Sequence, residues 1–435
     1  MRHVGLFILL LAAMGCTGGG GSSAGSGDKN AAANHAAATD HAPVPAPAVA
    51  DDSATDGPAE PADDEPASEP AVRQDPRELH GQRFEVETVA TGLRGPWAMA
   101  WLDDGRLIFT QRGGDLCIVE AGAVRRLHHF DQVQRPGGDG NGGSSSDGSG
   151  GDGGLMGLAV SPTFSRDGLI YISYTGLDGK TERNIIAKCR LAPDTGDGGP
   201  AVTQVRVVLS AVPASETHNS MPLRVGPDGM IWALSGDAGL GDRALPRSEL
   251  AGKLLRMTSD GQVPRDNPFA NSLVWTLGHR HGLGFDWHGA TGELYAIEQG
   301  AAEPDGLVNN DDGLYVIRKG RTYNAPSAHD GKTAVQYEPP MYTWPDPIGP
   351  AGAVFYRGDA FPAWRNRLFV AALDGRSLYC VTISDDDPAT VADVTARLLN
   401  EFGRLRAVAV GPDGYVYLAT DNGEDDRIIR LVPEK

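Results

Sequence analysis

One strand–turn–strand phrase recurs along the chain and constrains its fold more than any other feature of the sequence. Each copy has an apolar strand-like run, a tight turn rich in Asp, Gly or Asn, and a second strand-like run. The copies are AMAWLDDGRLIFTQ, GLAVSPTFSRDGLIYISY, LRVGPDGMIWALSG, GLGFDWHGATGELYAIEQ, AVFYRGDAFPAWRNRLFVAA and AVAVGPDGYVYLATD. Six units at roughly 50 to 70 residues each predict an all-β, six-bladed β-propeller over residues 81–435. A β-sandwich with similar hairpins is the alternative.

The first residues have the pattern of an export signal. Arg2 and His3 give a basic start, and residues 4–14 form an apolar run too short to span a bilayer. The sequence AMGC then resembles a bacterial lipobox, although Leu is usual where Ala13 stands. We therefore expect a signal peptide over residues 1–15 and lipidation at Cys16, with ordinary secretion as the alternative. This predicts a location in the bacterial cell envelope, lipid-anchored to the outer membrane and facing the periplasm or the cell surface.

Two segments are of low complexity. Residues 16–80 are rich in Ala, Pro, Asp and Gly and have almost no aromatic residue, which predicts a disordered tether. Residues 137–154 are rich in Gly, Ser and Asp and predict a flexible loop insertion within the propeller. The formal net charge of −19 argues against nucleic acid as a partner, because phosphates would be repelled.

Three further cysteines, Cys117, Cys189 and Cys380, each lie in a strand-like run. They are far apart in the sequence and have no metal-ligand spacing. We expect them to be small buried residues. One disulfide is possible but is not predicted.

The two ends of the predicted channel differ in the residues they carry. The hairpin turns within each copy lie at one end, so the loops that precede the first strand of each copy lie at the other. That second end carries His218, Arg280, Gly352 and Arg404. Convergent loops at one end of a propeller make a pocket candidate.

From about Phe84 to Pro433 the chain resembles the soluble aldose sugar dehydrogenases, the glucose/sorbosone dehydrogenase family. The resembling phrases run in the family's order, and GKLLRMTSDGQVPRDNPF is the most specific of them. The resemblance implies a six-bladed propeller that uses pyrroloquinoline quinone (PQQ) and calcium to oxidise an aldose at C1 to its lactone. It also implies a sugar substrate and a quinone or cytochrome as electron acceptor.

The resemblance also assigns roles to individual residues. His218 matches the base that takes the C1 hydroxyl proton, which suits a neutral imidazole. Arg280 matches the cation that stabilises the reducing quinone. The forked guanidinium groups of Arg404 and Arg406 match the residues that bind the carboxylates of PQQ. The carbonyl oxygens of Gly300 and Ala301 match those that hold calcium.

The sequence departs from the family within the same site. Ser220-Met221-Pro222 stands in place of Gly-Gly-Arg, His281 in place of Asn, and the family's Glu and Asn are missing around Gly313. Asp152 replaces a Gln. Asp374 replaces a Lys, and Asp in place of a cation should weaken the binding of a tricarboxylate cofactor through like-charge repulsion. The alternative function is therefore a degenerate, non-catalytic propeller lipoprotein that binds a carbohydrate or protein partner. A lactonase-type hydrolase ranks last, because no set of calcium-ligating carboxylates is evident.

Overall fold

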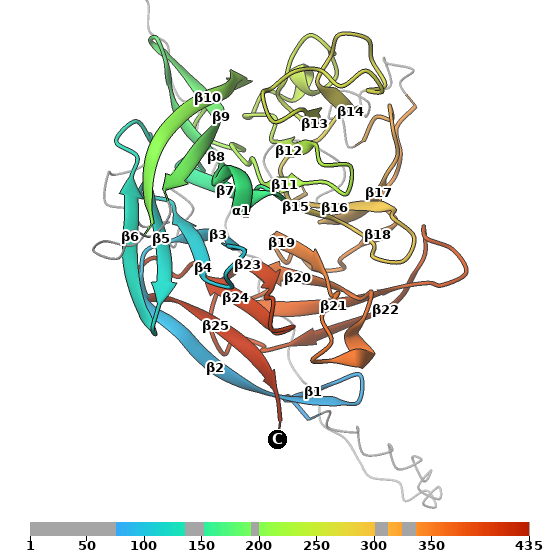
Figure 1. Cartoon of the computed structure of the whole chain (residues 1–435). Helices are drawn as coiled ribbons and strands as arrows, with labels where there is room; N and C mark the ends of the chain where they lie inside the picture. The colour runs from blue at the N-terminus through green and yellow to red at the C-terminus, as the bar shows by residue number, and fades with distance from the viewer. Residues whose placement is uncertain (1–74, 135–151, 193–199, 301–311, 324–335, 435) are drawn as a thin grey trace, which may run out of the picture. The chain divides into compact units, whose positions relative to one another are not determined.

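A computed structural model describes residues 75–134, 152–192, 200–300, 312–323 and 336–434. Six β-sheets are arranged around one axis (Figure 1); five of them have four strands and one has five. The predicted six-bladed β-propeller is confirmed. The predicted signal peptide, Cys16 and most of the predicted tether lie outside the described residues. Among those described, no helix is long and apolar enough to cross a membrane.

In each blade the strands lie side by side from the innermost strand, next to the channel, to the outermost strand. Blade 1 consists of β3 (Pro96–Trp101), β4 (Leu107–Gln111), β5 (Asp115–Glu120) and β6 (Ala123–His129). Blade 2 consists of β7 (Leu155–Val160), β8 (Leu169–Asp178), β9 (Thr181–Ala192) and β10 (Ala201–Pro213). Blade 3 consists of β11 (Leu223–Val225), β12 (Ile231–Ser235), β13 (Lys253–Met257) and β14 (Val274–Leu277).

The remaining blades follow the same order. Blade 4 consists of β15 (Gly282–Trp287), β16 (Leu294–Glu298), β17 (Gly313–Ile317) and β18 (Tyr342–Thr343). Blade 5 consists of β19 (Pro350–Phe355), β20 (Leu368–Ala372), β21 (Ser377–Ile383) and β22 (Val391–Arg397). Blade 6 consists of β23 (Leu405–Val410), β24 (Val416–Thr420), β25 (Asp426–Pro433) and β2 (Gln82–Leu93).

Both ends of the chain contribute to blade 6, which closes the ring. The N-terminal β2 pairs antiparallel with the C-terminal β25, and β1 (Glu78–Leu79) extends the same sheet. Such closure leaves no open edge between the first and last blades. The strand β1 falls within the last residues of the predicted tether, residues 16–80. Only a short α1 (Phe164–Asp167) and two described 3-10 turns, Gly241–Ala244 and Pro362–Trp364, interrupt the strands.

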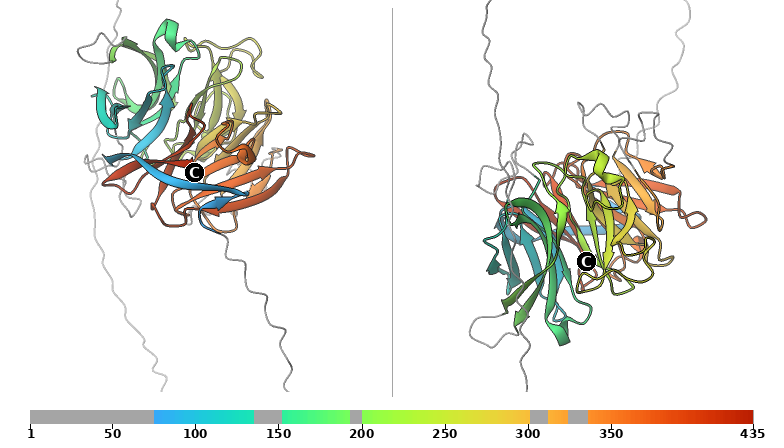
Figure 2. Two further views of the ribbon diagram at one scale, coloured as in Figure 1. Left: turned by 60° about the horizontal axis from the view of Figure 1, so that its bottom comes forward. Right: turned by 90° about the horizontal axis from the view of Figure 1, so that it is seen from above.

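The six recurring phrases form the two inner strands of the six blades. Their turns lie at one end of the channel, where Gly229 and Gly414 adopt φ values of 74° and 79° that favour glycine. The apolar faces of neighbouring blades pack on each other, as in the cluster that joins Trp97, Met221 and Leu283. Cys117, Cys189 and Cys380 are buried, as predicted, and all three are free thiols. Two side views show the blades as layers around the axis (Figure 2).

Candidate functional site

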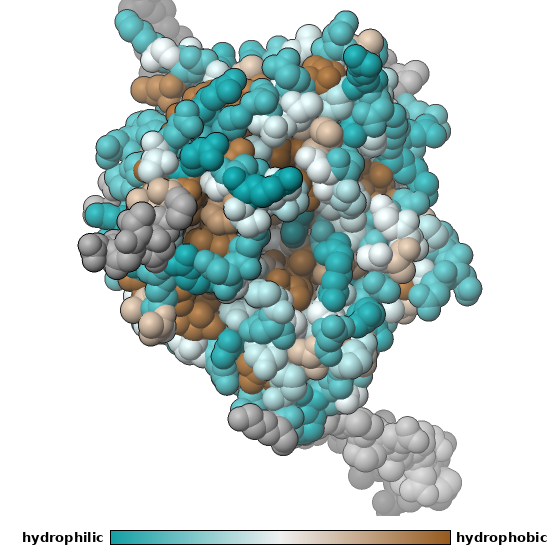
Figure 3. Space-filling view, viewed as in Figure 1, coloured by the Kyte–Doolittle hydropathy of each residue, from teal (hydrophilic) through white to brown (hydrophobic). Residues whose placement is uncertain are grey.

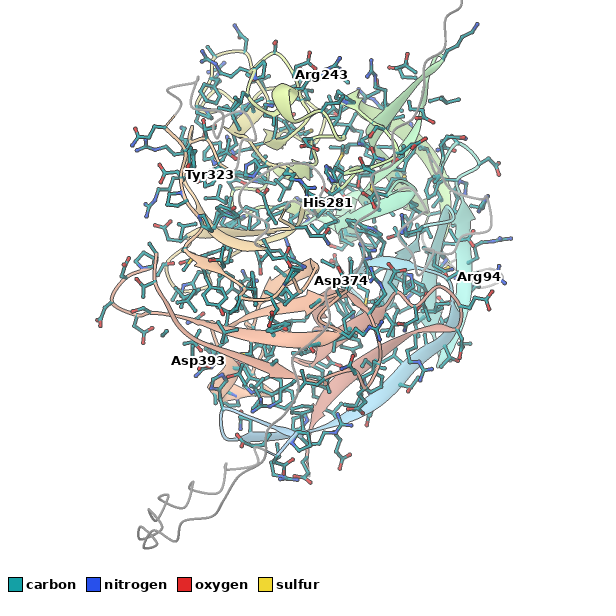
Figure 4. The ribbon with its side chains drawn as sticks, turned by 180° about the vertical axis from the view of Figure 1, so that it is seen from behind. Arg94, Arg243, His281, Tyr323, Asp374 and Asp393 are labelled. Atoms are coloured by element: carbon teal, nitrogen blue, oxygen red, sulfur yellow. The ribbon has the colours of Figure 1, made fainter. Side chains whose placement is uncertain are left out.

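The predicted site residues that the structure describes lie at the loop end of the channel, where the innermost strands begin. His281 precedes β15 and Asp374 follows β20, and both lie near the centre of the ring when it is seen from behind (Figure 4). Gly352 on β19 packs against the backbone of Arg406 and Ala407, so blades 5 and 6 meet there. The pocket candidate therefore combines loops from several blades.

His218 is held in an uncommon backbone conformation. Its φ is 54°, a left-handed value that few residues other than Gly, Asn and Asp adopt. Its carbonyl oxygen would lie only 2.0 Å from a Cβ placed on Gly236, so residue 236 must be glycine for the loop to pack there. On the other side, the backbone N–H of His218 donates to Asp152 Oδ2 at 2.7 Å. The loop thus fixes this histidine at the channel mouth.

Asp237 orients the imidazole of His218. The distance from Nδ1 of His218 to Oδ1 of Asp237 is 2.8 Å, which assigns the proton to Nδ1 and leaves Nε2 as the acceptor. The same carboxylate oxygen accepts the backbone N–H of Gly239 at 2.9 Å. Asp237 is buried, and its backbone N–H donates to the carbonyl oxygen of Arg280 at 2.8 Å. One residue therefore connects the histidine to the arginine.

Arg280 is buried, and main-chain oxygens orient its guanidinium. Nη1 donates to the carbonyl oxygen of Gly300 at 2.5 Å and lies 3.4 Å from that of Gln299. These two contacts hold the guanidinium in one orientation. The buried carboxylate of Glu298 accepts the backbone N–H of Arg280 at 3.0 Å and also contacts His279 Nδ1.

His281 stacks on His218. The ring centroids are 5.1 Å apart and the planes are inclined by 28°. Burial lowers the pKa of His281 to about 4, so this ring is neutral at pH 7. Burial raises the pKa of Asp152, but the neighbouring His281, the N–H of His218 and Arg112 outweigh burial and hold that pKa below its usual value. Asp152 is therefore ionised beside the two rings.

Arg404 and Arg406 each bind a carboxylate of the protein. Arg404 Nη1 contacts Asp374, and Arg406 binds Asp421 Oδ2 through Nε at 2.9 Å and Nη2 at 2.5 Å. Burial raises the pKa of Asp421, but the charge of Arg406 outweighs burial and lowers that pKa below its usual value. The other oxygen of Asp421, Oδ1, is buried and has no hydrogen-bond partner among the described residues. A buried oxygen without a partner is expected where a ligand or water is missing.

Of the two predicted calcium residues, only Gly300 is described, because Ala301 lies in the range 301–311. The N–H of Gly300 donates to Asp312 Oδ1 at 2.9 Å, and Asp312 Oδ2 accepts the N–H groups of Ile348 and Gly349. Burial raises the pKa of Asp312. Within the described ranges, no group of three His, Cys, Asp or Glu residues could hold a metal ion.

The residues that replace Gly-Gly-Arg after His218 belong to the core. Ser220 and Met221 are buried, and the carbonyl oxygen of Met221 accepts the hydroxyl of Ser173 at 2.5 Å. The carbonyl oxygen of Ser220 accepts the N–H of Gly236 at 3.0 Å. The loop therefore keeps His218 in place by main-chain bonds and apolar packing instead of an arginine.

A large hollow lies at the other end of the channel. It has a volume of about 960 Å³ and is lined by the hairpin end of all six blades, including Trp101, Arg224 and Trp287. The space-filling view faces this end and shows a hollow at its centre (Figure 3). None of the predicted site residues lines it.

Several site residues were not singled out by the sequence. Asp237, Glu298 and Asp421 each follow or end the second strand of a blade, as in LSGD, AIEQ and LATD. Those strands end at the loop end of the channel, where the innermost strands begin. The shared position of the three acids at the end of a second strand could therefore have identified them as site residues from the sequence. Arg112 follows β4, the second strand of blade 1, and is buried, with Nε 3.4 Å from the carbonyl oxygen of Gly153.

Comparisons with known proteins identify a matching family, similar sequences and a similar structure. The family model described as Glucose / Sorbosone dehydrogenase matches residues 93–430. An aldose sugar dehydrogenase of Escherichia coli is 29% identical over 374 residues, which cover 80% of this chain and 92% of that protein. Quinoprotein glucose dehydrogenase B of Acinetobacter calcoaceticus is 25% identical, with coverage of 78% and 86%. The PQQ-bound aldose sugar dehydrogenase of Streptomyces coelicolor aligns with a TM-score of 0.67 and 28% identity, covering 81% of this chain and 99% of that one.

Proposed function

The chain belongs to the glucose/sorbosone dehydrogenase family, and on this premise we propose that it oxidises an aldose sugar at C1 to its lactone with PQQ. The observation that carries the proposal is the His218–Asp237 pair, with 2.8 Å between Nδ1 and Oδ1, connected through the Asp237 backbone to Arg280. Removal of a hydroxyl proton beside a quinone requires a base, a carboxylate that orients the base, and a neighbouring cation.

The donor set at the loop end fits PQQ. Arg280 would bind the quinone oxygens, because a guanidinium stays charged at ordinary pH and the carbonyl oxygens of Gln299 and Gly300 hold this one in place. Arg404 and Arg406 would hold the carboxylates of PQQ through the guanidinium N–H groups that Asp374 and Asp421 do not engage. The partnerless Oδ1 of Asp421 beside Arg406 supports a ligand with a hydrogen-bond donor at this position.

His218 would act as the general base. Asp237 keeps the proton on Nδ1, so Nε2 is free of hydrogen and accepts the proton of the C1 hydroxyl. The buried Asp237 carboxylate then stabilises the imidazolium that forms. When bound, PQQ supplies a quinone that accepts the hydride from C1, so that C1 becomes the lactone carbonyl carbon.

Arg280 would stabilise negative charge that develops on oxygen during the oxidation. Its position is fixed from three sides, because Glu298 accepts its N–H, Asp237 donates to its carbonyl oxygen, and Gly300 accepts from Nη1. A donor that is held in place before the reaction needs no rearrangement when charge develops. After the sugar leaves, a quinone or a cytochrome would take up the electrons.

Calcium is implied by the resemblance, at the carbonyl oxygens of Gly300 and Ala301. The Gly300 oxygen already accepts Arg280 Nη1 at 2.5 Å, so a calcium ion there would place a second cation on the same oxygen. No step of the mechanism is therefore assigned to calcium. A titration of the PQQ-loaded protein with calcium and with a chelator measures whether turnover depends on it.

The experiment that tests the proposed function is product analysis after reconstitution. Purified protein is loaded with PQQ, with and without calcium, and given a panel of aldoses and an electron-accepting dye. We expect dye reduction and the matching lactone with at least one aldose. Absence of both with every aldose would overturn the proposal.

A binding protein without redox chemistry is the second candidate, and one observation favours it. Asp374 and Asp421 bind the two arginines that would hold PQQ, so part of their charge is already neutralised. Such a propeller would bind a carbohydrate or a protein partner at the loop end. Saturable sugar binding without any PQQ binding, measured by calorimetry, would favour this second function.

We also propose that the propeller is held at the outer membrane by a lipid on Cys16, facing the periplasm or the cell surface. The support is the basic start, the apolar run of residues 4–14 and the lipobox-like AMGC. Metabolic labelling with a fatty acid tests it. We expect label on the wild-type protein and none on Cys16→Ser, and an unlabelled wild type would contradict the anchor.

A further inference from the structure

Two residues contact His218 from sides that Asp237 does not reach. Asp152 enters from the residues that precede β7 and accepts the backbone N–H of His218 at 2.7 Å. His281 enters from the residues that precede β15 and stacks on the imidazole, with centroids 5.1 Å apart. The contacts come from blades 2 and 4, whereas His218 itself precedes blade 3. The proposed base therefore lies where the segments that precede the innermost strands of blades 2, 3 and 4 meet.

The backbone of His218 needs such support. A histidine with φ of 54° lies in a sparsely populated region and persists only where surrounding contacts fix it. The hydrogen bond to Asp152 holds the N–H side of the residue. On the other side its carbonyl oxygen accepts the N–H of Ala238 at 3.3 Å and lies directly against Gly236. Loss of the Asp152 bond leaves the backbone of this strained residue held on its carbonyl side only.

The ring of His281 is itself fixed. Its Nδ1 lies 3.0 Å from Gln299 Oε1, and its carbonyl oxygen accepts the N–H of Gln299 at 3.1 Å. Its Nε2 lies 3.8 Å from Oδ2 of Asp152, the same oxygen that accepts the His218 N–H. Because the ring is anchored on its far side, it provides a rigid surface for the imidazole of His218. The groups that face it are Asp152, His218, Arg280 and Asp237.

We propose that Asp152 and His281 are positioning residues for the base, with Asp152 fixing the backbone of His218 and His281 fixing the plane of its ring. The proposal rests on the proposed function, in which His218 Nε2 takes the sugar proton. It goes beyond that function because it assigns a task to two residues at which this chain departs from the family pattern. A small displacement of a catalytic group lowers the rate by about 10²-fold, so such positioning is worth a large factor in kcat.

The test compares two substitutions at residue 152. Asp152→Ala removes the acceptor, whereas Asp152→Asn keeps an amide oxygen that accepts the His218 N–H without the charge. In the cofactor-free protein, labelled with ¹⁵N-histidine, we expect amide hydrogen exchange at His218 to accelerate about 10-fold or more in Asp152→Ala and to change little in Asp152→Asn. In the PQQ-loaded protein, kcat should fall about 10²-fold in Asp152→Ala, with KM within about threefold, and recover largely in Asp152→Asn.

The companion test removes and restores the ring at residue 281. His281→Ala should broaden or split the imidazole ¹⁵N signals of His218 in the cofactor-free protein and lower kcat about 10-fold, while His281→Phe, which keeps a ring, restores both. Asp393→Ala, on the outermost strand of blade 5, is the control for folding and handling.

The outcomes separate the two claims. Unchanged His218 exchange in Asp152→Ala, or equal losses in Asp152→Ala and Asp152→Asn, would overturn the anchoring role of Asp152. Unchanged imidazole signals in His281→Ala would overturn the role of the second ring. If the PQQ-loaded wild type oxidises no aldose, the proposed function fails, and the measurements on the cofactor-free protein still decide the positioning claim.

Discussion

The two ends of the channel are built by the same six innermost strands, yet they differ in chemistry. The loop end brings together a histidine pair, buried arginines and buried carboxylates, including His218, Arg280 and Asp237. The hairpin end has a hollow of about 960 Å³, lined by turns and by partly exposed side chains, and none of the predicted site residues lines it. The buried charged groups of the loop end, and not this hollow, therefore identify the site.

The charged groups at the hairpin end hold strands together. Arg224 on β11 donates through Nε to the carbonyl oxygen of Phe285 and through Nη2 to that of Ala353, each at 2.6 Å. It thereby joins blades 3, 4 and 5. The buried Asp286 accepts the N–H of Phe355 at 2.7 Å and pairs with Arg357 at 3.1 Å. The comparison predicts that substitutions at this end change stability, and that substitutions at the loop end change turnover.

The largest difference between the ends should come from their histidines. His218→Ala removes the proposed base, so we expect kcat of the PQQ-loaded protein to fall about 10³-fold. His288→Ala, in the hairpin turn after β15, should leave kcat within about twofold. Steady-state kinetics with the best aldose measures both. Equal losses in the two variants would remove the distinction between the ends.

Arg224→Ala should have the converse effect. Loss of two charge-assisted hydrogen bonds that join three blades should lower the free energy of unfolding by about 2 kcal/mol. Turnover should stay within about twofold, because the loop end is untouched. Urea unfolding and steady-state kinetics on one preparation test this. A drop in kcat without a change in stability would contradict the assignment of Arg224 to structure.

The pH dependence of stability should reflect the loop end. The pKa of His281 is lowered to about 4 by burial, so the folded state binds fewer protons than the unfolded state between about pH 6.5 and 4. The contribution of the neutral His281 ring to the free energy of unfolding is therefore fully present above the pKa that this histidine has in the unfolded state. It is lost as pH falls through that window. The wild type should lose about 1–2 kcal/mol more than His281→Asn between pH 7 and pH 5. If both proteins lost the same free energy of unfolding between the two pH values, the effect of burial on the pKa of His281 would be contradicted.

The smallest expected change concerns the affinity for PQQ. Asp374 binds Arg404 and adds negative charge next to a tricarboxylate ligand. Asp374→Asn should tighten PQQ binding about fivefold, since about 1 kcal/mol of repulsion is removed. Asp393→Asn, far from the loop end on β22, is the matched control. Weaker binding in Asp374→Asn would indicate that the Asp374–Arg404 pair helps to hold the cofactor.

The sequence was sufficient for the architecture, because the strand–turn–strand phrase recurs and each copy specifies a hairpin. It did not reveal that β2 closes blade 6, since Gln82–Leu93 has no recurring phrase of its own and its partner β25 lies at the other end of the chain. Pairing between distant segments depends on the completed ring and not on local pattern.

The site was partly predictable for the same reason. The loop position of His218 and Arg280 followed from the order of strands and turns, and the resemblance supplied their roles. The contacts of Asp152 and His281 with His218 could not be predicted, because they depend on how three blades meet around one backbone conformation. The sequence also did not reveal that Arg404 pairs with Asp374 and that Arg406 pairs with Asp421.

The measurement that tests the central claim most directly is an equilibrium titration of the protein with PQQ, followed by its absorbance, for the wild type and His218→Ala. The account predicts that both bind one PQQ with the same Kd within about threefold, and that only the wild type then reduces a dye with an aldose. No saturable PQQ binding by the wild type, or turnover by His218→Ala at the wild-type rate, would contradict it.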